Sequence, residues 1–170
     1  AAAAGVLREG PGRTWDQLQK AVGALPQGRF VESRNGLRWL SHAEASLSNF
    51  LYSRGIEHRK GERYPKQFAE VSDAKYAIYD LHFKAKDGAW IDVEVWGDNP
   101  KGQQAEKYAR RRGHKEEFNQ GNQNFLGISH KSCYSDTVLT VLLAPYIGVV
   151  APFRFDKPSD VAIPSTHWSN

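Results

Sequence analysis

Alternation of apolar and polar residues is clearest in the middle of the chain. Tyr76–Ala85 and Ala89–Trp96 both alternate, and the segment between them, Lys86–Gly88, ends in Asp-Gly. Alternation places successive side chains on opposite faces of a strand, and Asp-Gly favours a tight turn. The pattern therefore predicts an antiparallel hairpin with one polar and one apolar face. The apolar face consists of the odd-numbered positions Tyr79, Leu81, Phe83, Ile91, Val93 and Val95.

Capping signals predict two helices nearer the N-terminus. A serine or threonine followed three residues later by Glu or Gln forms a capping box. Thr14 begins such a box before a helix over Trp15–Val22, and Ser41 begins another before a helix that ends at Gly55. In the second box Glu44 is the acidic member, and capping alone is enough to explain it.

Apolar runs and chain breakers predict the remaining elements. Residues 62–71 predict a short edge strand, and Gln103–Asn119 a long basic helix. Asn124–Ser129 predicts a short buried strand, and Asp136–Tyr146 an apolar helix with Asp136 as its N-cap. This order of helices and strands predicts an α/β sandwich around a central mixed sheet flanked by helices.

The chain reads as one domain, over residues 14–170. Residues 1–13 are small and contain Gly and Pro, so we expect a flexible N-terminal segment. Residues 27–36 are expected to be a polar connection, and the proline-rich tail after Pro152 an irregular wrap.

Composition is ordinary for a globular protein, with 40% apolar and 25% charged residues in 170. No apolar run approaches the roughly eighteen residues of a membrane span, and the N-terminal alanines lack the basic flank of a signal peptide. Cys133 is the one cysteine, so neither an internal disulfide nor a multi-cysteine zinc site is expected. A reducing, cytoplasmic location is therefore expected, with no membrane partner.

Charge favours nucleic acid only slightly. The formal net charge is +4 and the pI is about 9.2, but basic residues concentrate in Arg54–Arg63 and Lys107–Lys115. Such clusters are compatible with phosphate binding.

The polar face of the predicted hairpin carries acids. With an odd-numbered loop that has Gly88 in the left-handed conformation, Asp80 lies opposite Glu94, and His82 opposite Asp92. Directly opposed carboxylates repel each other, so a bound divalent cation is a natural reason for this arrangement. The alternative is an acidic face that is simply solvated.

Three segments resemble a known nuclease family: SHAEASLSNFLYSRGIEHRKGERYP, YDLHFKAKDGAWIDVEVWGD, and KYARRRGHKEEFN with NFLGISHKSCYSD. Over roughly residues 38–150 they resemble the PD-(D/E)xK superfamily, in particular the EDxHD-type phage and bacterial homing endonucleases related to very-short-patch repair endonucleases. The resemblance implies a restriction-endonuclease-like fold. It also implies that Glu44 is the helix acid, and that Asp80 and Glu94 are the catalytic acids that bind Mg²⁺ or Mn²⁺.

The sequence departs from that family at Trp96, where a lysine is usual. Tryptophan cannot stabilise charge on a phosphate. Either the positive group comes from the following helix, where Lys107, Arg111 and Lys115 share one face, or His82 takes this role. Lys115 is the first choice and Lys107 the second.

The leading hypothesis is a metal-dependent endonuclease acting on double-stranded DNA, of homing type or a mismatch or repair nicking enzyme. It would be associated with a bacterial or phage nucleoid, and a homodimer is compatible with the sequence. The alternatives are a non-catalytic DNA-binding module on the same fold and a protein-interaction domain with a solvated acidic face. The residues expected to contact DNA phosphates are Arg54, Arg59, Lys60, Arg63, Arg110, Arg111 and Arg112.

Overall fold

The computed structural model describes residues 30–72, 77–97 and 101–152. The predicted N-terminal segment, the helix over Trp15–Val22 and the tail beyond Pro152 lie outside these residues. In the described part of the chain, no helix combines the length and the apolar character needed to cross a membrane.

A four-stranded mixed sheet forms the centre of the fold. Its order is β3 (His58–Lys60), β4 (Leu81–Lys84), β5 (Trp90–Trp96) and β6 (Phe125–Ser129). The first three strands pair antiparallel, whereas β6 runs parallel to β5. A parallel pair needs a long crossover, which α5 (Gln103–Phe118) supplies. The predicted mixed α/β architecture is confirmed.

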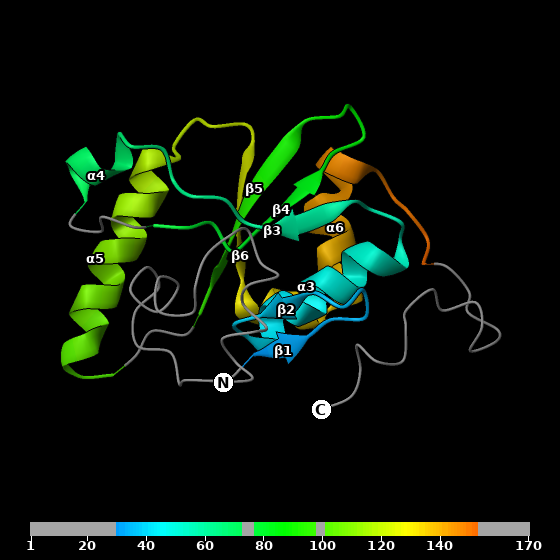
Figure 1. Cartoon of the computed structure of the whole chain (residues 1–170), viewed down its shortest axis with the longest axis horizontal. Helices are drawn as coiled ribbons and strands as arrows, with labels where there is room; N and C mark the ends of the chain where they lie inside the picture. The colour runs from blue at the N-terminus through cyan, green and yellow to red at the C-terminus, as the bar shows by residue number, and fades with distance from the viewer. Residues whose placement is uncertain (1–29, 73–76, 98–100, 153–170) are drawn as a thin grey trace.

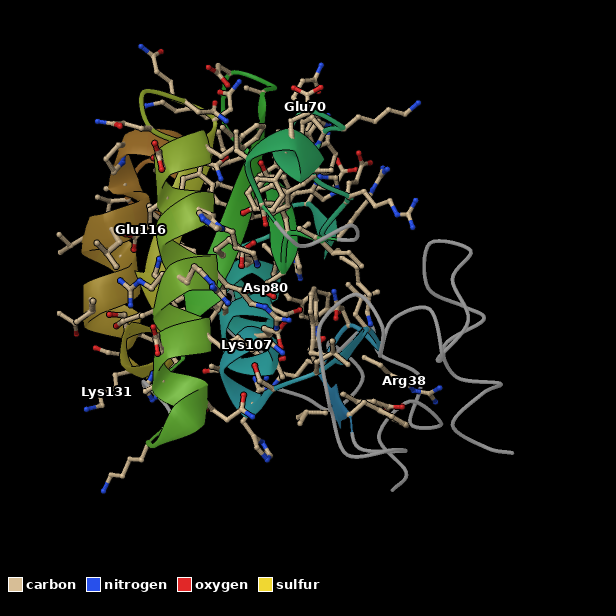
Figure 2. All side chains as sticks on the ribbon, turned by 90° about the vertical axis from the view of Figure 1, so that its left-hand side faces the viewer. Arg38, Glu70, Asp80, Lys107, Glu116 and Lys131 are labelled. Carbon is tan, nitrogen blue, oxygen red and sulfur yellow. The ribbon has the colours of Figure 1, made fainter. Side chains whose placement is uncertain are left out.

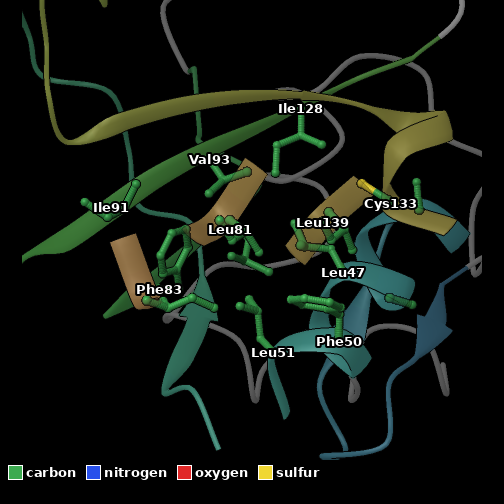
Figure 3. Close-up of a cluster of buried hydrophobic side chains, with 14 of the residues drawn as sticks. Leu47, Phe50, Leu51, Leu81, Phe83, Ile91, Val93, Ile128, Cys133 and Leu139 are labelled. Carbon is green, nitrogen blue, oxygen red and sulfur yellow. The ribbon is translucent and has the colours of Figure 1, made fainter. Parts of the chain in front are cut away.

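Helices cover both faces of this sheet. Figure 1 shows α5 on one side, and α3 (His42–Ser53) and α6 (Asp136–Ile147) on the other. The main core lies between the sheet and the second pair (Figure 3). Its fully buried side chains come from α3, the odd positions of the hairpin, β6 and α6; they include Leu47, Leu51, Leu81, Phe83, Val93, Ile128, Leu139 and Leu143.

The hairpin has the predicted register. His82 pairs with Asp92, and the Ala85 amide donates to the Ala89 carbonyl across the Lys86–Gly88 loop. Gly88 has φ +89°, the left-handed conformation that closes such a loop. The first strand is shorter than predicted, because the chain bends at Asp80. Beyond that bend Tyr79 leaves the main core and joins a second cluster with Tyr64, Phe68 and Ala77.

The helix caps agree with the sequence except at α6. The Ser41 hydroxyl accepts from the Glu44 amide at 3.2 Å, and Gly55 follows α3 with φ +68°. At α6 the N-cap is Ser135, whose hydroxyl accepts from the Val138 amide at 3.2 Å, rather than Asp136. Both residue types cap well, so the sequence did not decide between neighbours.

Several short elements were predicted wrongly. No strand spans residues 62–71; the strand is β3, just before them, and α4 (Phe68–Val71) occupies the end of that stretch. The expected connection over 27–36 contains β1 (Val31–Glu32), which pairs with β2 (Arg38–Trp39). A 3-10 helix, His130–Tyr134, precedes α6. Two- and three-residue strands are too short to show a periodicity.

The strand β6 was predicted to be buried, yet of its five residues only Ile128 is fully buried. It lies at the edge of the sheet, where pairing on one side leaves the backbone partly open.

Gly61 lies where two backbones meet. A Cβ there would stand 1.9 Å from the carbonyl oxygen of Tyr79, so the close approach of the two backbones requires glycine. We expect Gly61→Ala to lower the free energy of unfolding by about 2 kcal/mol, the scale of overpacking.

Gly113→Ala is the matched control, because a Cβ there meets nothing within 4 Å. In mid-helix it should raise the free energy of unfolding by about 0.5–1 kcal/mol. Urea denaturation measures both, and equal stabilities of the two variants would contradict the expectation.

Candidate active site

Three carboxylates converge where β4 begins and β5 nears its end. The paired register of the hairpin ends at Leu81 and Val93, and Asp80, the residue before β4, lies against the end of β5 near Glu94. Glu44, in the first turn of α3, lies near enough to Asp80 for their charges to interact, and its Oε2 accepts a hydrogen bond from the Ser41 hydroxyl at 2.6 Å. Asp80 in turn raises the pKa of both glutamates, as a neighbouring negative charge does. The structure thus brings together the three acids that the sequence singled out.

The backbone of β5 fixes the Asp80 side chain. Its Oδ2 accepts a hydrogen bond from the Val95 amide at 2.7 Å, while the Asp80 amide donates to the Val93 carbonyl at 3.0 Å. Asp80 is therefore tied to β5 although it lies outside β4. In Figure 2 it lies beside α5, on the side to which Lys107 extends.

Burial keeps the glutamates partly protonated. Glu44 is 6% exposed and Glu94 is 2% exposed. Burial first, and then the charge of Asp80, raise the pKa of each to about 8 from the usual 4.5. At neutral pH the site therefore holds less negative charge than three carboxylates could carry, and a cation able to replace the protons would be favoured there.

Lys115 supplies a positive charge at this cluster. Its Nζ lies 2.8 Å from Oε1 of Glu94, from a side chain that is 22% exposed. Lys115 was the first choice from the sequence for this positive group, and its contact with Glu94 is direct. Lys107, the second choice, is exposed and forms no ion pair with the described residues.

A second lysine approaches from the other face of the sheet. Lys60, on β3, is partly buried, with its Nζ 5.7 Å from the centre of the Trp39 ring. Burial lowers the pKa of Lys60, and the nearby Glu44 opposes this. Lys60 therefore belongs to the border of the acidic cluster. The sequence assigned it only to the outer DNA-contacting surface.

Trp96, in place of the usual lysine, ends β5 two residues after Glu94. It is 9% exposed, and its Nε1 would stand 2.4 Å from a Cβ at Gly127, so its ring needs glycine there. The Arg112 guanidinium lies over the indole, 5.0 Å from the ring centre. Arg112 also pairs with Glu116 at 2.6 Å. Trp96 thus positions an arginine of α5.

His82 contacts Trp90 and Asp92. Its ring stacks obliquely on Trp90 with the centroids 4.6 Å apart, and Nδ1 is 3.9 Å from Asp92 Oδ1. Arg59 lies over the same indole at 4.9 Å. Burial lowers the pKa of His82, which is 7% exposed. These contacts leave Lys115 as the positive group nearest to Glu94.

Most of the expected phosphate contacts lie on the surface. Arg59, Arg63, Arg110 and Arg111 are exposed. Arg54 is the exception and corrects the prediction. Its guanidinium is buried, 3.6 Å from the Phe50 ring centre and bonded to the Phe50 carbonyl, where no phosphate can reach it. A run of basic residues in the sequence does not show which side chains point to solvent. Here Arg54 is the C-cap residue of α3, and its side chain packs back against that helix.

The sequence did not predict a second partner of Glu94 Oε1, which is the hydroxyl of Tyr64. The Tyr64 hydroxyl donates to Glu94 Oε1 at 2.8 Å, and Asn119 bonds to that hydroxyl at 3.3 Å. Tyr64 belonged to a predicted edge strand, and Asn119 ended a predicted helix. Neither position carries a sequence signal for such a contact.

The donor chemistry suits a hard divalent cation. No group of three or more His, Cys, Asp or Glu among the described residues forms a ready-made metal cage. Mg²⁺, however, commonly binds through one or two carboxylates and fills its remaining positions with water and phosphate oxygens. Asp80 and Glu94 offer this pair. The raised pKa values of Glu44 and Glu94 show that these carboxyl groups are buried and close to another negative charge, which a cation would neutralise. The residues present therefore fit such an ion.

Comparisons with known proteins found no match to a family model, a curated protein or a solved structure. The geometry of the site therefore has to support any function by itself.

Proposed function

We propose that this protein is a metal-dependent DNA endonuclease that hydrolyses phosphodiester bonds at the cluster of Glu44, Asp80 and Glu94. The observation that carries the proposal is the ion pair between Lys115 and Glu94, at 2.8 Å, near Asp80. A partly buried lysine beside these acids supplies the positive group that Trp96 does not. This favours catalysis over the first of the two alternatives, a non-catalytic DNA-binding module.

Each residue has a defined task in this proposal. Asp80 and Glu94 hold Mg²⁺ or Mn²⁺. When bound, the ion lowers the pKa of a coordinated water and stabilises charge on phosphate oxygens. Lys115 donates to the oxygens on which negative charge develops, and a preorganised donor is most effective there. Glu44 lies near Asp80, where its carboxylate adds to the attraction for a cation once its proton has left.

Exposed basic residues on two sides of the site would bind the DNA backbone. Arg110 and Arg111 extend from α5, and Arg59 and Arg63 lie on and after β3. Contacts of this kind fix the position of the duplex without reading its sequence. Homing-type cleavage and mismatch or repair nicking both fit this arrangement, and double-stranded DNA is the expected partner.

Plasmid nicking tests the proposal directly. Wild-type protein should nick supercoiled DNA with Mg²⁺ and not with EDTA, and Asp80→Asn should lose activity by about a thousandfold because it removes a metal ligand. Glu94→Gln should lose cleavage but keep DNA affinity. Salt-dependent DNA binding without any Mg²⁺-dependent cleavage would instead identify the non-catalytic module, and no DNA affinity at low salt would identify a protein-interaction domain. Full activity of Glu94→Gln would exclude Glu94 as a ligand.

A further inference from the structure

A buried chain of hydrogen bonds ends on Glu94. The Tyr79 hydroxyl donates to Asn119 Oδ1 at 2.9 Å, and Asn119 Nδ2 donates to the Tyr64 hydroxyl at 3.3 Å. Tyr64 then donates to Glu94 Oε1 at 2.8 Å. Asn119 Nδ2 also donates to the main-chain carbonyl of Lys115 at 2.8 Å. All three polar side chains of this chain are at most 7% exposed.

The direction of these bonds is fixed by chemistry. A carbonyl oxygen can only accept, so Asn119 must turn Nδ2 toward Lys115 and Oδ1 toward Tyr79. With both Nδ2 protons in use, the Tyr64 oxygen accepts one of them and its own proton is left for Glu94. Every donor and acceptor of the Asn119 side chain is engaged, and a fully satisfied buried network holds its members rigidly.

Aromatic packing holds the rings independently of these bonds. The Tyr64 ring stacks on Tyr79 with the centroids 3.8 Å apart, and it touches Phe68 at 4.5 Å and Phe118 at 5.9 Å. Phe118 ends α5, and Asn119 is the C-cap of that helix. The cluster therefore anchors the end of α5 against the segment that follows β3, and a Tyr→Phe change removes a hydroxyl while leaving the ring contacts.

The network forms hydrogen bonds with both residues of the Lys115–Glu94 ion pair. It binds the side chain of Glu94 through Tyr64, and the backbone of Lys115 through Asn119. We propose that Tyr64 is a positioning residue, which fixes Glu94 Oε1 toward Lys115 and thereby presents the other carboxylate oxygen of Glu94 to the metal and substrate. This inference rests on the proposed endonuclease function and names a residue that neither the sequence pattern nor the acidic cluster suggested.

Tyr64→Phe tests it, with Tyr79→Phe as the matched variant. Both remove one hydroxyl from the same aromatic cluster, but only the first removes a donor to Glu94. We expect Tyr64→Phe to lower kcat by about ten- to a hundredfold, the scale of a hydrogen bond to a charged group, with KM for DNA nearly unchanged. Tyr79→Phe should have a several-fold smaller effect, because Asn119 keeps its bonds to Tyr64 and Lys115.

A double-mutant cycle separates positioning from general destabilisation. If Tyr64 acts through the ion pair, Tyr64→Phe should lower kcat by a much smaller factor in a Lys115→Met background than in wild type. The effects of mutations at residues that act through one contact are not additive. Additive losses, equal losses in the two tyrosine variants, or a rise in KM that accounts for the whole effect would each overturn the proposal.

Amine labelling provides a readout that does not need activity. Lys115 and Lys107 lie on the same helix, so acetylation of Lys115 relative to Lys107, measured by mass spectrometry, reports how firmly Lys115 is held. Tyr64→Phe should raise this ratio by about threefold or more, the size of one lost hydrogen bond. An unchanged ratio would overturn the positioning role. If wild-type protein does not cleave DNA but the ratio still rises, the endonuclease proposal fails while the positioning of Lys115 stands.

Discussion

Replacing Lys115 with methionine is expected to lower the rate of DNA cleavage by about two orders of magnitude or more, the scale of losing one donor to developing charge. Methionine keeps the length of the side chain but removes the ammonium that lies 2.8 Å from Glu94. Affinity for DNA should change little, because one cation is a small part of the electrostatic attraction. Single-turnover cleavage and a filter-binding titration measure the two effects separately.

Lys107→Met is the comparison for that experiment. Lys107 lies two helical turns away on α5 and is exposed, so its loss should cost far less cleavage. Equal reductions in cleavage and binding for Lys115→Met would mean that this lysine only grips the DNA backbone. His82, on the same sheet face near Asp92, would then be the better candidate for assisting the reaction.

In metal-free buffer, the stability of the folded protein is expected to fall as the pH rises from about 5 to about 9. Glu44 and Glu94 have pKa values of about 8 in the folded protein, against the usual 4.5. Between these values the folded state binds more protons than the unfolded state, so the free energy of unfolding falls with rising pH. A decrease in Tm of about 5 °C or more is expected, the size of one to two kcal/mol in a domain of this length.

Mg²⁺ should oppose this loss. A ligand that binds only the folded state raises Tm, and an ion that replaces protons at Asp80 and Glu94 binds better as those protons leave. The difference in Tm between Mg²⁺ and EDTA should therefore grow from pH 6 to pH 8.5. The controls are Glu44→Gln and Glu94→Gln, each of which should flatten the pH dependence in EDTA. A Tm that is level across this range in wild-type protein would contradict the raised pKa values.

Local sequence determined most of the regular elements. Alternation and Asp-Gly specify the hairpin, because a strand with one buried face has one register that keeps its apolar residues inside. That register pairs His82 with Asp92 and ends at Leu81 and Val93, and the bonds that Asp80 makes to β5 beyond it hold Asp80 near Glu94. Local sequence also sets the ends of α3, at Ser41 and just before Gly55, since capping depends on residues close in sequence. The short strands β1, β2 and β3 escaped prediction because their pairing partners, rather than their own pattern, stabilise them.

What only the tertiary structure decided is which side chains reach the acids. Lys107, Arg111 and Lys115 share one face of α5, and helical spacing alone does not show which of them reaches the acids. The packing of Phe118 against Tyr64 and Phe68 sets the end of the helix against the sheet, and so brings Lys115 rather than Lys107 to Glu94. Likewise the basic run Arg54–Arg63 gives no orientation: Arg54 is buried on Phe50, Lys60 turns toward Glu44, and Arg59 stays exposed. Sequence determines charge and local geometry, whereas contacts between distant segments depend on how whole elements pack, which no local pattern encodes.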